Sequence, residues 1–82
     1  MRKNSKFASK ICWLMYKIQY INICINEFAR RFSLEPQVSC RYLLKFKALD
    51  FLDEHYEAEH VLPLQDTVDS LQMICRRNGG SL

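Results

Sequence analysis

The chain has 82 residues, of which 49% are hydrophobic and 26% charged, and it contains only two glycines and two prolines. This composition excludes a disordered chain and favours one small domain that buries about 60% of its unfolded surface. Long segments without helix-breaking residues predict an all-α fold. We expect a single helical domain over residues 6–80, in which one long N-terminal helix is packed by three shorter helices. A flexible basic arm is expected over residues 1–5.

The formal net charge is +3, but it is unevenly distributed along the chain. Residues 1–47 contain ten Lys or Arg and two acidic residues, a net charge of +8, whereas residues 48–82 contain two Arg and seven acidic residues, a net charge of −5. The two halves attract each other, which favours packing within the chain or head-to-tail association. The simpler interpretation is two solvated faces of one domain, and the functional one is a basic patch for an acidic partner.

The cysteines and the N-terminal apolar run indicate the cellular compartment in which the protein is expected. None of the cysteines forms a C-x-x-C pair, and each lies in an apolar segment, where a free thiol behaves as a small hydrophobe. The apolar run over residues 11–16 is interrupted by Lys17 and Asn22, is shorter than the roughly 20 residues of a membrane span, and lacks a cleavage site. We therefore expect a cytoplasmic protein with no membrane segment and with reduced thiols. The cysteines are Cys12, Cys24, Cys40 and Cys75.

Residues 7–32 predict the long helix around which the domain is organised. An alternating β-branched run over residues 21–25 would also suit a strand, but the sequence offers no second run for it to pair with. Twenty-six helical residues span about 39 Å, and a compact domain of this size is roughly 30 Å across, so one end should overhang or be covered by a second chain. Leu14, Ile18, Ile21 and Ile25 are expected to be buried. The apolar stripe, at spacings of three and four, consists of Phe7, Ile11, Leu14, Ile18, Ile21, Ile25, Phe28 and Phe32.

Three shorter helices are expected to follow. Ser33 is the expected N-cap of a helix over residues 34–47, which has Pro36 in its first turn. A further helix is expected over residues 49–58, and the last one begins at Leu64 and stops at Asn78-Gly79, where glycine allows a left-handed turn. The side chains expected to face inward are Val38, Tyr42, Leu43, Phe46, Leu49, Leu52, Tyr56, Leu64, Val68, Leu71 and Cys75.

The sequence contains no convincing catalytic or metal-binding motif. His55 and His60 are five residues apart, which puts their imidazoles about 140° apart on a helix, a spacing unsuited to a shared metal ion. We expect Tyr56 to pack inward and His60 to support the turn that follows. No Ser or Cys has a nucleophile signature around it, and no glycine-rich loop could hold phosphate. The interpretation is a non-enzymatic protein without a cofactor or a metal.

Nucleic-acid binding is the alternative interpretation. The second and third helices have the lengths of a helix-turn-helix with a short connection. The third helix, however, would bring negative charge toward the phosphates, which opposes its use as a reader. The basic second helix and the N-terminal arm could still contact a nucleic-acid backbone. The acidic residues concerned are Asp50, Asp53, Glu54 and Glu57.

A family resemblance adds to this interpretation. The stretches over residues 24–29, 49–60 and 74–80, with the Tyr-x-x-x-His element formed by Tyr56 and His60, resemble a small bacterial family of helical proteins of unknown function, the DUF3791 type. The resemblance covers about residues 20–80. It implies an uncharacterised helical protein, and some such proteins are encoded beside ADP-ribosyltransferase-like toxins, which suggests an antitoxin or accessory role. Pro63 stands where similar sequences usually have a Ser cap.

The expected function is therefore that of a protein-interaction module. Trp13, Tyr16 and Tyr20 broaden the apolar surface of the long helix beyond what three short helices can cover, and exposed aromatic side chains are common interface anchors. Lys10 and Lys17 would form the polar rim of that surface. The expected partner is another protein, such as a toxin encoded nearby, or a second copy in a homodimer. Nucleic acid is the second choice, and no membrane partner is expected.

Overall fold

The N-terminal half of the chain is one long helix, α1, which comprises Arg2–Arg31. The computed structural model of the protein describes the backbone of residues 2–82 and the side chains of residues 14–82. The helix forms because its apolar residues recur every three or four positions and no Gly or Pro interrupts them. It starts earlier than the expected residue 7, so the backbone over residues 2–5, expected as a flexible arm, is helical. The side chains of Lys10 and Trp13 lie outside the described part.

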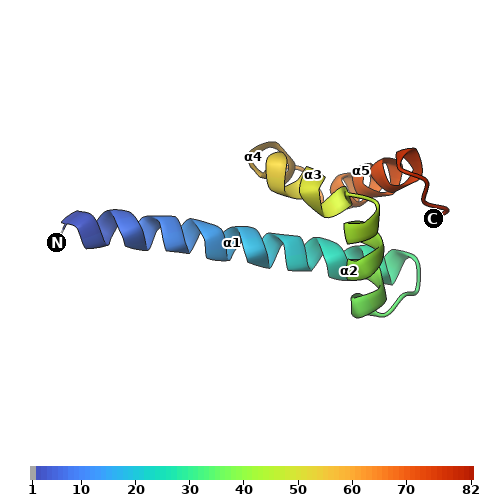
Figure 1. Cartoon of the computed structure of the whole chain (residues 1–82), viewed down its shortest axis with the longest axis horizontal. Coiled ribbons are helices and arrows are strands. Elements are labelled where there is room, and N and C mark those ends of the chain that lie inside the picture. The colour runs from blue at the N-terminus through green and yellow to red at the C-terminus, as the bar shows by residue number, and fades with distance from the viewer. Residues whose placement is uncertain (1) are drawn as a thin grey trace.

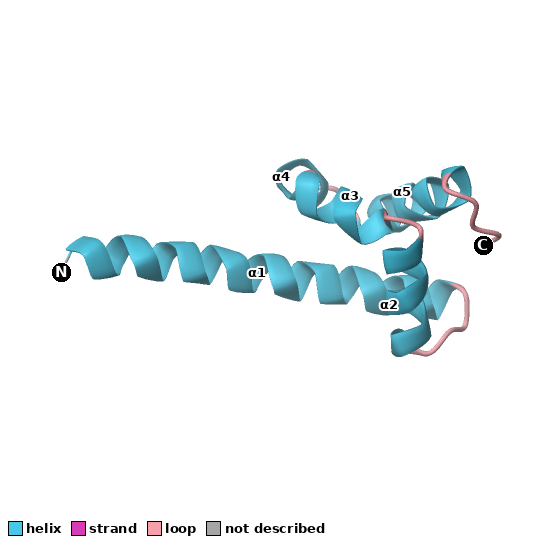
Figure 2. Cartoon of the chain, viewed as in Figure 1, coloured by secondary structure: helices cyan, strands magenta, loops and turns pink. Residues whose placement is uncertain are grey.

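Four shorter helices follow, joined by short loops (Figure 2). The described residues 2–82 contain no strand, which confirms the all-α prediction. The expected single helix over residues 49–58 was wrong in detail, because the backbone breaks at His55, which has φ −112° and ψ 23° and separates α3 from α4. The helices are α2, Pro36–Lys45; α3, Ala48–Glu54; α4, Tyr56–Glu59; and α5, Leu64–Arg77.

Three of the helices end in a left-handed residue. Ser33 has φ 55°, its N–H bonds to the carbonyl of Arg30, and the next N–H bonds to the carbonyl of Ala29 at 2.8 Å, which is a Schellman motif. The N-cap role expected for Ser33 was therefore wrong, and α2 begins after Glu35, whose side chain makes no capping bond. Lys47 at φ 65° and Gly79 at φ 104° follow α2 and α5 in the same way. A left-handed residue at a helix end is most favourable as glycine, and of these three positions only Gly79 is a glycine.

The core lies where the shorter helices pack on the C-terminal half of α1 (Figure 1). Salt bridges and amide contacts reinforce this packing at the surface: Arg31 pairs with Asp69, and Gln65 donates to Glu27 at 3.3 Å. Among the residues of the shorter helices that were expected to face inward, only the prediction for Val38 was wrong, since its side chain is 44% exposed. The buried apolar residues that make up the core are Cys24, Ile25, Phe28, Leu43, Ala48, Leu52, Val68, Leu71 and Cys75.

The N-terminal half of α1 projects beyond this core (Figure 1). The molecule measures 50 × 22 × 22 Å, because a helix of this length exceeds the width of the packed part, as the sequence predicted. Ile25 is buried, as expected, and Ile21 is only half-buried, but Leu14 is 44% exposed and Ile18 is 57% exposed. The prediction that these last two residues are buried was wrong. They lie on the expected stripe but outside the core, because the contacts that α3 and α4 make at this level of α1 are with Lys17 and Tyr20.

Candidate interaction surface

The apolar stripe of α1 divides into a covered and an uncovered part. From Ile21 onward it is packed against α2, α3 and α5, whereas Leu14 and Ile18 have no such cover among the described residues. Phe7 and Ile11 continue the same spacing toward the N-terminus. Leu14 and Ile18 are therefore apolar side chains of the stripe that water contacts.

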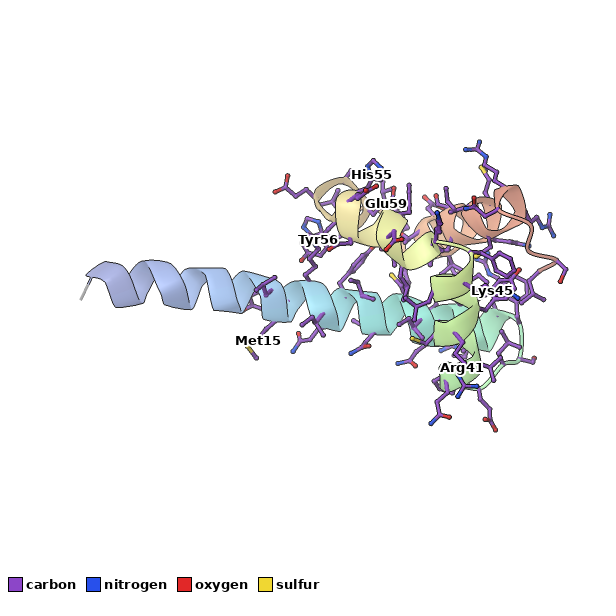
Figure 3. The ribbon with its side chains drawn as sticks, in the orientation of Figure 1. Met15, Arg41, Lys45, His55, Tyr56 and Glu59 are labelled. Carbon is purple, nitrogen blue, oxygen red and sulfur yellow. The ribbon has the colours of Figure 1, made fainter. Side chains whose placement is uncertain are left out.

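Two further apolar side chains are exposed at the same level of α1. Met15 is 56% exposed and Tyr16 is 65% exposed. Figure 3 shows Met15 pointing away from α4, so apolar residues occur on more than one side of the helix here. We call Leu14, Met15, Tyr16 and Ile18 the exposed segment of α1. Tyr16 is thus accessible, as its predicted role as an interface anchor requires.

Lys17, expected at the rim of the interface, instead joins α1 to α3. Its ammonium group lies 2.5 Å from Asp53 Oδ1, and its side chain is only 13% exposed. The ammonium group also lies 5.9 Å from the centre of the Tyr56 ring, a cation–π distance. Lys17 therefore contributes to packing within the chain and marks the boundary between the core and the exposed segment.

Tyr20 likewise faces the domain. Its ring packs edge-on against Tyr56 at a centroid distance of 5.5 Å, and its hydroxyl donates to Thr67 Oγ1 at 3.2 Å. Burial raises the pKa of Tyr20 to about 12. The phenol therefore stays neutral and links α1 to the start of α5, so it is a structural group and only partly accessible to a partner.

The Tyr56–His60 element spans α4, with Tyr56 as its first residue and His60 as its C-cap. Tyr56 is 8% exposed, as predicted, and its ring stacks on His60 at 4.5 Å with an interplanar angle of 12°. His60 Nδ1 lies 2.7 Å from the carbonyl oxygen of Tyr56; because a carbonyl can only accept, this nitrogen carries the proton. His60 thus supports the end of α4, and the role expected for it in the turn that follows stays a prediction.

Glu59 was missed by sequence reasoning. It is half-buried, and its Oε1 is buried without a hydrogen-bond partner among the described residues. Thr67 Oγ1 bonds to the Glu59 carbonyl at 3.4 Å. The available signal was its spacing of three residues from Tyr56, which places both on the inner face of the helix.

The buried thiols are poor nucleophiles. Burial raises the pKa of Cys24 and that of Cys75 to about 11, so both are protonated near neutral pH. Cys40 is half-buried, and all three are free. Within the described residues, no group of three or more His, Cys, Asp or Glu side chains is arranged to hold a metal ion. In the same part of the chain, no helix combines the length and apolarity needed to cross a membrane.

The basic residues of α2 lie away from the exposed segment of α1. Arg41 and Lys45 project from α2 at the opposite end of the molecule from the N-terminus (Figure 3). Both are exposed, as is Lys47 in the following turn. Asp50, near the start of α3, is also exposed and places a negative charge close to them in sequence. This surface is therefore mixed in charge and not purely basic.

The arrangement defines a small all-helical domain with one overhanging helix. The chain belongs to the family described as a protein of unknown function (DUF3791), whose match covers residues 19–78. The matched region begins just before Tyr20, where α1 contacts α5, and ends at the close of α5. It therefore corresponds to the packed domain and leaves out the exposed segment. No curated protein and no solved structure matches the chain.

Proposed function

We propose that this protein is a non-enzymatic interaction module that binds another polypeptide through the exposed segment of α1. The proposal is based on one observation: the apolar stripe of α1 is buried over only part of its length. Ile25 is 8% exposed, whereas Ile18, seven residues earlier on the same face, is 57% exposed. Exposing such side chains costs about 25 cal/mol per Å² relative to burying them. A partner that covers them recovers that free energy.

The chemistry of the described side chains supports the non-enzymatic part of the proposal. Cys24 and Cys75 are protonated and buried, and the Tyr20 phenol is held neutral by its surroundings. His60 is engaged with the backbone of its own helix. Each of these groups stabilises the packed domain. A cytoplasmic location suits a chain with such free thiols, and we include it in the proposal.

We propose that the partner is a protein. The biological role we propose is that of an antitoxin-like or accessory protein that acts beside a toxin encoded nearby. The test uses sedimentation velocity of the purified chain, alone and with the product of the neighbouring gene. Ile18→Asp should weaken association at least about tenfold, because a charge placed in a desolvated contact is costly. Val61→Asp is the matched control, since Val61 is 71% exposed in the loop between α4 and α5.

Two results would contradict the proposal. One is a chain that associates neither with itself nor with the neighbouring protein. The other is association that Ile18→Asp and Val61→Asp weaken equally. Circular dichroism of both variants, showing the helix content of the unmodified protein, would establish that neither substitution acts by unfolding the domain.

A second candidate is nucleic-acid binding through α2, favoured by the exposure of Arg41, Lys45 and Lys47. Binding of this kind would fall steeply with salt, because counterions are released from the phosphates. Fluorescence anisotropy with labelled duplex DNA at two salt concentrations tests it. Reversing charge with Arg41→Glu and Lys45→Glu should abolish such binding, whereas Ile18→Asp should leave it unchanged.

A further inference from the structure

The uncovered stripe of α1 has a fixed end. Toward the C-terminus, Ile25 and Phe28 are already buried by the shorter helices of the same chain, so a partner on this face must stop before them. The stopping point is the level of Lys17 and Tyr20, where α1 meets Asp53 of α3 and Tyr56 of α4. The described part of the available face ends at Ile18, and from there the backbone of α1 continues toward Arg2, so that Arg2 to Ile18 makes about five turns of helix.

We propose that the occupant of this face is the same half of α1 from a second copy of the chain, running antiparallel. This inference rests on the proposed function and names its partner. A parallel pair is disfavoured sterically. Both packed domains would then lie at the same end of the pair, and each domain would occupy the face of α1 along which the other helix has to lie. An antiparallel pair places the two domains at opposite ends, and each helix ends where the partner's domain begins.

Charge complementarity supports the second copy as occupant. An antiparallel helix would bring its first turns against the end of the stripe, beside a surface depression of about 420 Å³ lined in part by Glu54 and Glu57. Both acids are exposed, whereas Asp53 beside them is paired with Lys17. The first turn of α1 contains no acid, and Arg2 and Lys3 stand at its start. The N-terminus of a helix is also the positive end of its dipole, so this end suits the acidic depression.

Apolar burial supplies most of the affinity in this arrangement. Lys6 and Lys10 are present on both helices, and like charges on neighbouring helices repel each other. The contact of the basic ends with Glu54 and Glu57 offsets this repulsion and determines orientation, which is the usual contribution of charge at an interface. The N-terminal half of α1 thus pairs with the same half of the second copy through Leu14 and Ile18. Phe7 and Ile11 continue the stripe at the same spacing in the sequence.

The first experiment measures self-association of the full chain by sedimentation equilibrium. We expect a dimer, and Leu14→Asp should raise its dissociation constant at least about tenfold. Val61→Asp is the control for a charge placed on another exposed apolar residue. Leu14 lies outside the core, so the variant should keep the thermal midpoint of the unmodified chain at a concentration where both are monomers. A chain that remains monomeric at high micromolar concentration would overturn the inference.

The second experiment tests orientation by zero-length coupling of amines to carboxylates, followed by mass spectrometry. Antiparallel pairing predicts links from Lys3 or Lys6 to Glu54 or Glu57. A link from Lys3 is out of reach within one chain, because Lys3 and Lys17 are separated along a straight helix by about 21 Å. Mixing isotopically labelled and unlabelled chains shows that a link joins two molecules. A dimer without such links would overturn the antiparallel arrangement.

The two proposals fail differently. A monomer whose binding to the neighbouring protein is abolished by Leu14→Asp would overturn the second copy as occupant and leave the proposed function intact. A chain that neither dimerises nor binds the neighbouring protein would overturn both. Charge reversal adds a further distinction: Glu57→Lys should weaken the dimer several-fold, whereas Asp66→Lys, an equal change of charge on α5, should not. Equal effects of the two reversals would count against the arrangement.

Discussion

The Tyr20 hydroxyl donates a hydrogen bond to Thr67 Oγ1 over 3.2 Å, and this contact joins the middle of α1 to the first turn of α5. The two residues are 47 positions apart in the sequence. Thr67 is fully buried and its hydroxyl also bonds to the carbonyl of Glu59, so one side chain connects α1, α4 and α5. The contact lies at the boundary between the packed domain and the overhanging half of α1.

Removing this hydrogen bond should cost a modest amount of stability. Tyr20→Phe is expected to lower the free energy of unfolding by about 1 kcal/mol, because a neutral buried hydrogen bond is lost while the ring packing on Tyr56 is kept. Urea unfolding followed by circular dichroism measures the change. Thr67→Val completes a double-mutant cycle, and additive effects of the two substitutions would show that the hydroxyls do not interact.

Two isoleucines on one face of α1 should differ sharply in their contributions. Ile25→Ala is expected to lower the free energy of unfolding by about 2–5 kcal/mol, since it removes buried methyl groups from the core. Ile18→Ala should change it by no more than about 0.5 kcal/mol, because that side chain is exposed in the monomer. The measurement is made below the concentration at which the chain associates, and Ile25→Val provides a milder variant. Equal losses at the two positions would show that Ile18 is covered within the chain.

The buried thiols predict a loss of stability at alkaline pH. The pKa of Cys24 and that of Cys75 are raised from 9.0 to about 11, so the folded state holds protons that the unfolded state releases. The contribution of the two neutral thiols to the free energy of unfolding is complete below pH 9 and is lost as the pH rises from about 9 to about 11. Thermal unfolding measured across this range should show it. A variant with Cys24→Ala and Cys75→Ala should have a flatter profile, and an unchanged profile would contradict the assignment.

Lys47 follows α2 in a left-handed conformation that glycine adopts more easily. Lys47→Gly should raise the free energy of unfolding by about 0.5–1 kcal/mol, because the steric cost of a side chain at φ 65° is removed. Arg41→Gly is the control, since the same replacement inside α2 should lower it by about 1 kcal/mol. Thermal denaturation of both variants measures the difference. Destabilisation by both would mean that strain at Lys47 is negligible.

The candidate surface was predicted only in part. The excess of apolar residues on the long helix and its overhang followed from composition and length, and Tyr16 is exposed as expected. Lys17 and Tyr20 were assigned to the interface but pack against Asp53 and Thr67. Spacing along a helix gives the face of each residue, but it does not say which other helix reaches that face. Such pairings depend on contacts between residues far apart in the sequence.

The sequence by itself determined that this protein is helical, where most of its helices lie, and that its long helix is apolar on more than one side. These properties follow from local spacing and from the absence of Gly and Pro, which act within a few residues. Only the tertiary structure decided where along the stripe burial stops, between Ile18 and Ile25. That boundary depends on which side of α1 the shorter helices cover, since α3 and α4 contact Lys17 but leave the neighbouring Ile18 exposed. The same side chain is core or surface according to whether another helix covers it.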